Sequence, residues 1–262
     1  MIKVSLVIST YNWKEALYLS LISVSRQTIL PYEVVIADDG SRQDTAEMLR
    51  QIKPHLPFQL KHIWQEDKGF QKTSIMNKAF AACEGNYIIQ IDGDIILERH
   101  FIADHISEAH KGYYIHGSRG KLSQKLTNKL LREKDYHFSF FTKGVRRKFN
   151  VFRCPLLTIL FHNYKKNKKE RGCNMAFWKE NVYAVNGYDE RIEGYGFEDI
   201  DLPARLRRLG IKKQLVKFKA IEYHLEHSAT NSKKDMSANQ KIFDSNNALG
   251  IIRAPKGIDQ YL

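Results

Sequence analysis

Cysteine is scarce in this sequence. The 262 residues include only Cys83, Cys154 and Cys173, which are far apart and show neither CxxC nor Cys/His spacing. Three isolated cysteines exclude a disulfide framework and give no reason to expect a zinc site. We therefore expect a reducing, cytoplasmic setting.

Long hydrophobic runs are also missing. No apolar stretch reaches the roughly 18 residues that a membrane-spanning helix needs. The opening residues, MIKVSLVISTYN, reach polar residues too early for the apolar region of a signal peptide, and they predict a first strand instead. The hydrophobic content of 43% excludes a disordered chain. We expect a folded protein without a membrane span.

Negative charge is nearly absent from the middle of the chain. Residues 119–179 contain 17 Lys or Arg and only three acids, and aromatic residues are interleaved with Arg146, Arg147 and Lys148. Such a segment can serve nucleic acid, an anionic membrane surface or an acidic polysaccharide, or it can be a solvated loop. Because no nucleic-acid motif of defined spacing occurs, we expect no nucleic-acid partner. We favour contact with the inner leaflet of a membrane, and an acidic glycan stays open as the alternative.

Apolar runs alternate with amphipathic segments in the first third of the chain. This alternation is typical of an α/β sheet with parallel strands. Strands are expected over residues 4–9, 33–37, 58–64 and 86–91, and helices over residues 14–27, 44–52 (capped by Asp44) and 72–83.

After residue 97 the pattern is less regular. Helices are expected over residues 98–112 and 122–131, with a short strand at 113–116. No repeat or low-complexity linker divides the chain. We therefore predict one domain over residues 1–262, in which lobes 1–97 and 98–262 are intertwined and the basic aromatic insertion covers about residues 119–179.

Two carboxylates interrupt the apolar stretch IIQIDGDIIL, residues 88–97. Asp92 and Asp94 follow an expected strand, and ligands gather at the carboxyl ends of strands in open α/β sheets. Burying two ionised carboxylates close together is costly unless a cation or hydrogen-bond donors compensate. A turn at Asp92-Gly93 with both side chains in water is the alternative. We favour a divalent metal site.

A second acidic pair, Asp38-Asp39, ends the strand expected over residues 33–37. Followed by Gly40-Ser41, the pair can cap the next helix, or one carboxylate can accept hydrogen bonds from a base or ribose. The glycine-rich phosphate loop GxGxxG is absent, so a bound nucleotide needs another phosphate anchor. A metal held by Asp92 and Asp94 would bridge the diphosphate.

Four motifs occur in a fixed order: SLVISTYN (5–12), EVVIADDGS (33–41), IDGD (91–94) and GYGFEDID (194–201). With this set the chain resembles family 2 glycosyltransferases of the GT-A fold. The last motif, with NGYDE (186–190) ahead of it, is also similar to the C-terminal part of β-galactosyltransferases and bacterial chondroitin-type polymerases. The resemblance implies a mixed central sheet flanked by helices, with a nucleotide-binding lobe and an acceptor-binding lobe.

The resemblance further implies an inverting transfer from a UDP-sugar to a hydroxyl of a glycan or lipid-linked saccharide, in bacterial surface polysaccharide or lipopolysaccharide synthesis. A carboxylate must take the proton of the attacking hydroxyl, and Mn²⁺ or Mg²⁺ stabilises the leaving diphosphate. The alternative is a non-catalytic nucleotide-sugar or nucleic-acid binder on the same fold. A retaining transferase and a sugar-phosphate nucleotidyltransferase are lesser rivals. Nucleotidyltransferases usually open with a Gly-rich loop, and this sequence does not contain one.

On the donor side, residue roles follow from the family position by position. Thr10, Tyr11 and Asn12 would lie in the loop that touches the nucleotide, and Asp39 would contact the uracil or ribose. Asp94 would ligate the metal directly. Asp92, next to Gly93, would touch the ribose or a water on the metal.

The stretch DKGFQKTSIMN, residues 67–77, matches a glycine-containing stretch that precedes the DxD in the family. It places Lys72 and Asn77 among the nucleotide-sugar-binding candidates. Many members have an arginine immediately before the Asn, whereas this chain has Met76. Lys72 would supply the missing positive charge, although an ammonium group cannot make the bidentate hydrogen bonds of an arginine guanidinium.

On the acceptor side, the resemblance makes Asp199 the catalytic base and gives Glu198 the role of binding the acceptor. The alternative is an acidic loop that caps the helix expected from Leu202, and Asp201 suits that role best.

A histidine completes the metal site in the family, and EYHLEHS, residues 222–228, offers His224 and His227. We favour His224. Residues three apart on a strand face opposite sides, so one metal would hold both histidines only if the chain turned between them. A lone surface histidine is the alternative.

Overall fold

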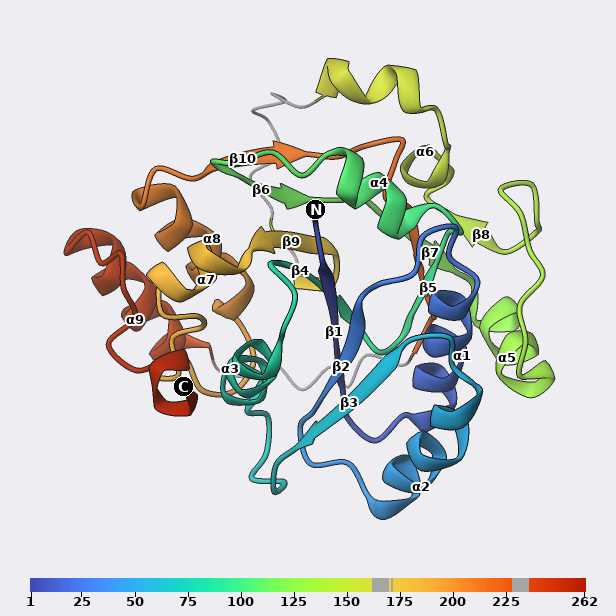
Figure 1. Cartoon of the computed structure of the whole chain (residues 1–262), viewed down its shortest axis with the longest axis horizontal. Helices are drawn as coiled ribbons and strands as arrows, with labels where there is room; N and C mark the ends of the chain where they lie inside the picture. Colours follow the sequence, from blue (N-terminus) through green and yellow to red (C-terminus); the bar gives the residue numbers. More distant parts are fainter. Residues whose placement is uncertain (162–169, 171, 228–235) are drawn as a thin grey trace.

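The structure is a computed structural model that describes residues 1–161, 170, 172–227 and 236–262 (Figure 1). Within these residues it contains a seven-stranded sheet of order β10-β6-β9-β4-β1-β2-β3 and a four-stranded sheet of order β5-β11-β7-β8. Both sheets mix parallel and antiparallel pairs. The expected mixed α/β architecture is therefore confirmed.

The first half of the chain follows the predicted order, with every boundary within two residues of its expected place. The elements are β1 (Val4–Thr10), α1 (Lys14–Ser25), β2 (Glu33–Asp38), α2 (Gln43–Ile52), η1 (Lys53–His55), β3 (Gln59–Trp64), α3 (Lys72–Ala82) and β4 (Tyr87–Asp92). One detail was wrong: α2 begins before Asp44, so Asp44 does not cap it and instead pairs with Lys14 at 2.8 Å.

The second half consists of shorter elements. They are β5 (Ile95–Leu97), α4 (Phe101–Ser107), β6 (Tyr113–His116), β7 (Arg119–Leu122), α5 (Gln124–Glu133), β8 (Val145–Arg146), α6 (Lys148–Val151), η2 (Pro155–Phe161), η3 (Gly172–Asn174), β9 (Met175–Trp178), α7 (Lys179–Ala184), α8 (Glu198–Arg208), β10 (Lys212–Leu215), β11 (Glu222–His224), α9 (Ser237–Ala248) and η4 (Ile258–Tyr261).

Two helix predictions in this half were too long. The helix expected over residues 98–112 is limited to α4, and the chain turns at Gly112, whose φ is +81°. The helix expected from Leu122 begins later, because Leu122 ends β7 and pairs with Val145 of β8. Ser123 caps α5 by accepting a hydrogen bond from the Leu126 N–H.

Helices cover both faces of the larger sheet (Figure 1). Alternate side chains of β1 point to opposite faces, as the strand geometry requires. Leu6 and Ile8 pack with α1, α2 and α4, whereas Val7 packs with α3, α7 and α8. These apolar layers hold the strand ends in fixed positions.

The smaller sheet joins distant parts of the sequence. β11 pairs with β5 on one side and β7 on the other, and His224 stands opposite Ile95. Since β5 begins directly after Asp94, this pairing brings the end of β11 to the acidic motif. None of the described helices has the length and apolarity to cross a membrane.

Candidate functional site

The candidate site lies where β1, β2 and β4 end. The register pairs Thr10 with Asp38 and Ser9 with Asp92, so the three carboxyl ends meet at one edge of the sheet. The Gly93 N–H donates to the Ser9 carbonyl at 2.7 Å. A Cβ on Gly93 would lie 3.0 Å from that oxygen, so the acidic turn packs tightly against β1.

Three potential metal ligands converge next to this turn. Asp94 Oδ2 lies 3.1 Å from His224 Nε2 and 3.3 Å from His227 Nε2. β11 ends at His224 and the chain leaves the strand there, which allows His227 to return to the same side. The condition for both histidines to face one ion is therefore met.

The arrangement fits a divalent cation. Neighbouring ligand atoms around an ion held at about 2.1 Å are roughly 3 Å apart, close to the observed spacings. Among the described residues, buried Asp94 Oδ1 and His224 Nδ1 have no hydrogen-bond partner. Burial opposes the charge of Asp94, but hydrogen bonds with His224 and His227 outweigh it and hold the pKa of Asp94 below its usual range.

Lys72 connects the strand end with the acidic pair on α8. Its Nζ donates to Asp92 Oδ1 at 3.0 Å and lies 3.8 Å from Asp199 Oδ1. Ser9 Oγ donates to the same Asp92 oxygen. Burial opposes the charge of Lys72, but the carboxylates of Asp199 and Asp92 outweigh it and raise the pKa of Lys72 well above its usual value.

Glu198 and Asp199 lie in the first turn of α8, where carboxylates interact favourably with the helix dipole. The helix begins after Phe197, a non-glycine residue with φ of +73°. Burial, together with the neighbouring charge of Asp199, raises the pKa of Glu198 to about 7. Glu198 Oε2 is buried and has no hydrogen-bond partner within the described chain.

A buried polar network holds α8 in place. Arg205 is fully buried, and its Nε donates to Asp201 Oδ2 at 2.7 Å. The guanidinium also donates to the carbonyls of Val185 and Gly187, which flank the start of the NGYDE motif. Asn246 donates to the other oxygen of Asp201. Asp201 therefore belongs to the framework of the site. The expectation that it caps a helix starting at Leu202 was wrong, because α8 already begins at Glu198 and Asp201 lies inside it.

The two carboxylates of the Asp38-Asp39 pair have different partners, and neither caps α2, whose N-cap residue is Arg42. Asp38 accepts from the Ser41 N–H at 2.8 Å and so closes the turn. Asp39 accepts from Gln65 Nε2 at 2.7 Å and from the Gln71 N–H at 2.9 Å, on separate oxygens. Burial raises the pKa of Asp39.

The loop after β1 presents an aromatic ring beside this pair. Tyr11 is 53% exposed, and its hydroxyl donates to Asp67 Oδ2 at 2.9 Å. Asn12 has φ of +49°, and its side-chain oxygen accepts from the Arg42 N–H. Gly40, with φ of +92°, packs against the backbone of Asp67, where a Cβ would clash.

Asn77 occupies a different place from the other candidates. It is fully buried, and its amide binds the Tyr188 carbonyl, the Tyr188 N–H and Glu190 Oε1. These three bonds tie α3 to the NGYDE motif. The structure thus gives Asn77 a positioning role, where the sequence suggested direct contact with the donor.

Arg119 is a candidate site residue that the motifs did not reveal. It begins β7, pairs with Glu222 in the sheet register and has a buried Nε with no hydrogen-bond partner in the part of the chain described. Burial opposes its charge, but Cys173, Glu222, Asp92 and Asp94 together raise the pKa of Arg119. Its position inside a basic segment gave no signal that distinguished it.

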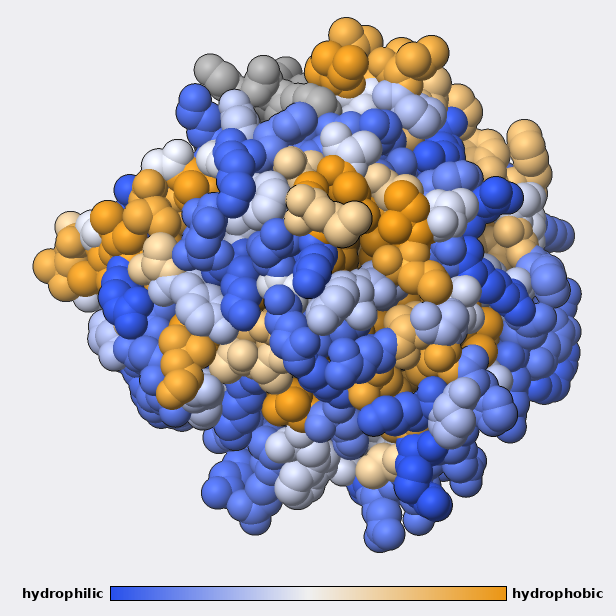
Figure 2. Space-filling view, viewed as in Figure 1, coloured by the Kyte–Doolittle hydropathy of each residue, from blue (hydrophilic) through white to orange (hydrophobic). Residues whose placement is uncertain are grey.

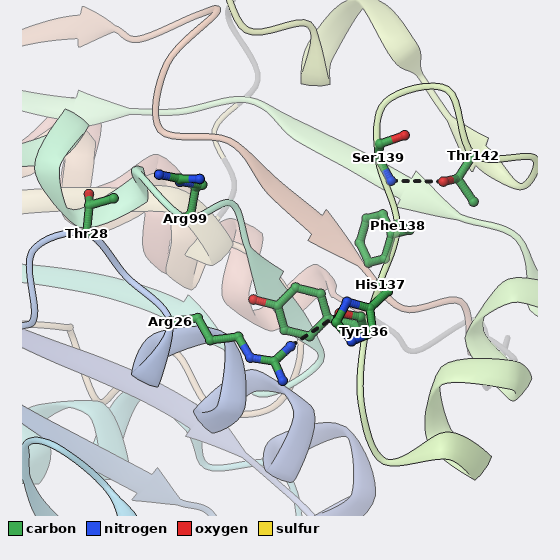
Figure 3. Close-up of a pocket in the computed structure, with 8 residues that line it drawn as sticks. All are labelled: Arg26, Thr28, Arg99, Tyr136, His137, Phe138, Ser139 and Thr142. Carbon is green, nitrogen blue, oxygen red and sulfur yellow. Dashed lines mark hydrogen bonds between the residues drawn. The ribbon is translucent and has the colours of Figure 1, made fainter.

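A pocket of about 730 Å³ lies elsewhere, between the end of α1 and the loop after α5 (Figure 3). Its lining residues are Arg26, Thr28, Arg99, Tyr136, His137, Phe138, Ser139 and Thr142. Arg26 turns toward Tyr136 and pairs with Asp135 at 2.7 Å. The pocket contains no residue of the strand-end site.

Two family models match the chain. Residues 5–166 match glycosyl transferase family 2, and residues 157–228 match a model described as the N-terminal domain of galactosyltransferase.

Curated relatives are bacterial glycosyltransferases. The chain is 27% identical to chondroitin synthase of Escherichia coli over 91% of its own length, and it spans 37% of that protein. It is 28% identical to the uncharacterized glycosyltransferase YfnE of Bacillus subtilis, with 90% and 68% of the two chains covered. Validoxylamine A glucosyltransferase of Streptomyces hygroscopicus is 26% identical over 79% of the chain and 48% of the relative.

Solved structures share the fold at low identity. TarS of S. aureus superposes with a TM-score of 0.65 at 16% identity, over 99% of this chain and 41% of TarS. The mannosyltransferase PcManGT of Pyrobaculum calidifontis, solved with GDP-Man and Mn²⁺, has a TM-score of 0.58 at 15% identity, with 95% and 62% covered. GalNAc-T7, solved with UDP, GalNAc and Mn²⁺, has a TM-score of 0.60 at 15% identity, with 87% and 44% covered.

Proposed function

The chain belongs to glycosyl transferase family 2 and has the GT-A fold, and from this premise we propose that it transfers a sugar from a UDP-sugar to an acceptor hydroxyl with inversion. The observation that carries the proposal is the link through Lys72. One ammonium group lies between Asp92 beside the potential metal ligands and Asp199 on α8. The residues proposed to act on the donor and those proposed to act on the acceptor would thus adjoin at Lys72.

On the donor side, we assign nucleotide binding to the loop of Thr10, Tyr11 and Asn12, with Asp39 contacting the uracil or ribose. TarS has been solved with UDP-GlcNAc, and the two proteins share the fold. Asp92 and Gly93 would face the ribose and diphosphate. Lobe 1–97 would hold the donor and lobe 98–262 the acceptor.

Asp94, His224 and His227 would hold Mn²⁺ or Mg²⁺. When bound, the ion would stabilise the negative charge that grows on the leaving diphosphate. Lys72 and Arg119 would add positive charge to the same group, in place of the arginine that Met76 replaces. Both positive charges would already be in place before the reaction begins, as electrostatic stabilisation of a transition state requires.

On the acceptor side, Asp199 would accept the proton of the acceptor hydroxyl while the hydroxyl oxygen attacks the anomeric carbon. The bond to the diphosphate breaks on the opposite face of the sugar, so a single displacement inverts the configuration. Ionised Glu198 would accept a hydrogen bond from the acceptor and orient it. With a pKa of about 7, Glu198 would change its charge near neutral pH.

The names of two relatives support a proposal for the acceptor class. One relative is named as a chondroitin synthase, and another is named as an undecaprenyl-phosphate sugar transferase, 28% identical over 59% of this chain. We propose a glycan or lipid-linked saccharide acceptor in bacterial surface polysaccharide or lipopolysaccharide synthesis. The enzyme would act on the cytoplasmic side, peripherally on the inner membrane, through the basic segment. Residues 162–169 and 171 of that segment lie outside the described residues.

A panel of UDP-sugars with glycan and lipid-linked acceptors, with and without Mn²⁺, tests the proposal through release of UDP. One donor is expected to turn over with Mn²⁺, and Asp199→Asn is expected to lower kcat by at least about 10²-fold. Asp44→Asn, at an exposed surface pair, is the matched control. Binding of UDP-sugar without UDP release would favour a non-catalytic binder. If no donor reacts and Asp199→Asn behaves like wild type, the mechanism is wrong.

A further inference from the structure

Large apolar side chains are exposed on η2. Leu156 is 87% exposed, Ile159 73% and Leu160 74%. Together with Leu157, they form what we call the apolar ridge. η2 stands out from the body of the molecule at the top of Figure 1, and apolar surface is concentrated at the same place in Figure 2.

One face of η2 is fixed to the protein. Thr158 is fully buried, and its hydroxyl donates to the Lys217 carbonyl at 2.9 Å. The Cys154 N–H donates to the Phe218 carbonyl at 3.1 Å. Side chains three apart align along a 3₁₀ helix, so Ile159 follows Leu156 and Leu160 follows Leu157 on the outward side.

An aromatic cluster lies at the end of η2. The rings of Phe149, Phe152 and Phe161 lie 5.4, 6.1 and 5.2 Å from the ring of Phe218. Lys217 Nζ lies 4.0 Å from the centre of the Phe149 ring. The helix that carries the ridge is therefore held by packed side chains. Exposed apolar patches of this kind mark interaction sites.

Positive charge lies along the chain just before the ridge. Residues 141–161 contain no Asp or Glu. Lys143, Arg147 and Lys148 are exposed, and within the described residues Lys143 and Arg147 form no ion pair. Apolar side chains next to a basic stretch of chain complement an anionic lipid surface. The lipid tails accommodate the apolar side chains, and the anionic headgroups attract the basic ones.

We propose that the apolar ridge inserts into the boundary between headgroups and acyl chains of an anionic bilayer, with Lys143, Arg147 and Lys148 at the headgroups. The purpose of this contact rests on the proposed function, because a lipid-linked acceptor lies in such a surface. The contact itself is independent of catalysis. Insertion goes beyond electrostatic adsorption, because it requires Leu156, Ile159 and Leu160 as well as the basic residues.

Co-sedimentation of the full chain with vesicles tests the inference. Wild type is expected to bind phosphatidylcholine vesicles containing phosphatidylglycerol at least about tenfold more tightly than pure phosphatidylcholine vesicles. The triple variant Leu156→Ser/Ile159→Ser/Leu160→Ser is expected to lose binding to the anionic vesicles by about tenfold or more. Leu249→Ser is the matched control, because Leu249 is 72% exposed on the far end of α9, and it is expected to bind like wild type.

A depth measurement separates insertion from adsorption. The tryptophan of Leu160→Trp is expected to shift its emission to the blue on anionic vesicles and to be quenched by brominated acyl chains. Unchanged binding of the triple variant, no binding by wild type, or no quenching would overturn the inference. A dimer in sedimentation velocity that the triple variant dissolves would also overturn it and assign the ridge to self-association.

Catalysis without vesicles distinguishes this inference from the proposed function. With a soluble acceptor, the triple variant is expected to release UDP at the wild-type rate. Lipid binding without UDP release by wild type would overturn only the proposed function, and UDP release without lipid binding would overturn only the inference.

Discussion

Lys72 donates a hydrogen bond from Nζ to Asp92 Oδ1 at 3.0 Å, so a cation from the start of α3 lies on the carboxylate that ends β4. The same ammonium group is 3.8 Å from Asp199. Loss of Lys72 would therefore leave Asp92 and Asp199 without their shared counter-charge and remove positive charge from the proposed diphosphate site.

Lys72→Met is expected to lower kcat by about 10²-fold, because it removes a preorganised charge from the proposed transition state. Lys72→Arg keeps the charge and is expected to lose less. Steady-state release of UDP measures both, with Lys14→Met at an exposed pair as the control. Equal kcat for Lys72→Met and Lys14→Met would contradict the role.

Glu198→Gln is expected to stabilise the protein above neutral pH while lowering activity. The pKa of Glu198 is about 7 in the folded protein, against an ordinary value of 4.5 for a glutamate side chain. Between these values the folded state holds a proton that the unfolded state has released, so the free energy of unfolding of wild type falls as pH rises. Gln cannot ionise, so the free energy of unfolding of Glu198→Gln does not fall in this way.

The stabilisation is expected to reach about 1–3 kcal/mol at pH 8 and to vanish near pH 4. Urea unfolding of wild type and variant at both pH values measures it. Glu180→Gln, at an exposed acid paired with Lys111, provides the control. Parallel pH curves for wild type and Glu198→Gln would show that Glu198 is not held neutral by its surroundings.

Removal of metal is expected to abolish UDP release, and added Mn²⁺ to restore it. His224→Ala and His227→Ala are each expected to weaken Mn²⁺ binding by at least about tenfold, because each removes one ligand atom. Calorimetric titration of Mn²⁺ measures this without catalysis. His55→Ala, at an exposed position, is the control. Wild-type affinity in His227→Ala would leave His224 and Asp94 as the ligands from the protein.

Arg119→Ala is expected to weaken UDP binding by about tenfold or more, because hydrogen bonds to charged groups contribute about 1.5–3 kcal/mol. Arg119→Lys is expected to recover only part of the affinity, since it keeps the positive charge but loses the bidentate hydrogen bonds of the guanidinium. Fluorescence titration with UDP and with uridine distinguishes the diphosphate from the base. Equal losses for both ligands would place Arg119 away from the diphosphate.

Arg205→Met is expected to destabilise the fold by about 3–5 kcal/mol, because buried Asp201 would lose its partner. The double variant Arg205→Met/Asp201→Leu removes both charges and is expected to recover part of the loss. Urea unfolding measures the two free energies. A single variant as stable as wild type would show that the Asp201 charge finds another partner.

The first half of the fold was predictable because β1, β2 and β4 are buried on both faces and read as apolar runs. The smaller sheet was not. β5, β7, β8 and β11 have two to four residues each, too few for a periodic signal, and their pairing depends on contacts between distant parts of the chain. Local sequence does not encode those contacts.

The candidate site shows the same division. Asp92 and Asp94 were found because acids stand out in an apolar strand, and the turn that brings His227 beside Asp94 was stated only as a condition. The raised pKa of Glu198 depends on burial by residues from other elements. Arg119 was hidden among many basic residues, and only its place in β7 identifies it.

The position of β9 has a consequence for the synthesis of the chain. β9 lies between β4 and β6 and pairs antiparallel with both. A growing chain therefore completes β1, β2, β3 and β4 long before the ribosome has produced the strand that covers the open edge of β4. Such late, non-local pairing slows folding and exposes a strand edge that other chains can pair with. The strands that carry the donor half of the site thus keep an open edge until β9 has been made, although their own residues come first.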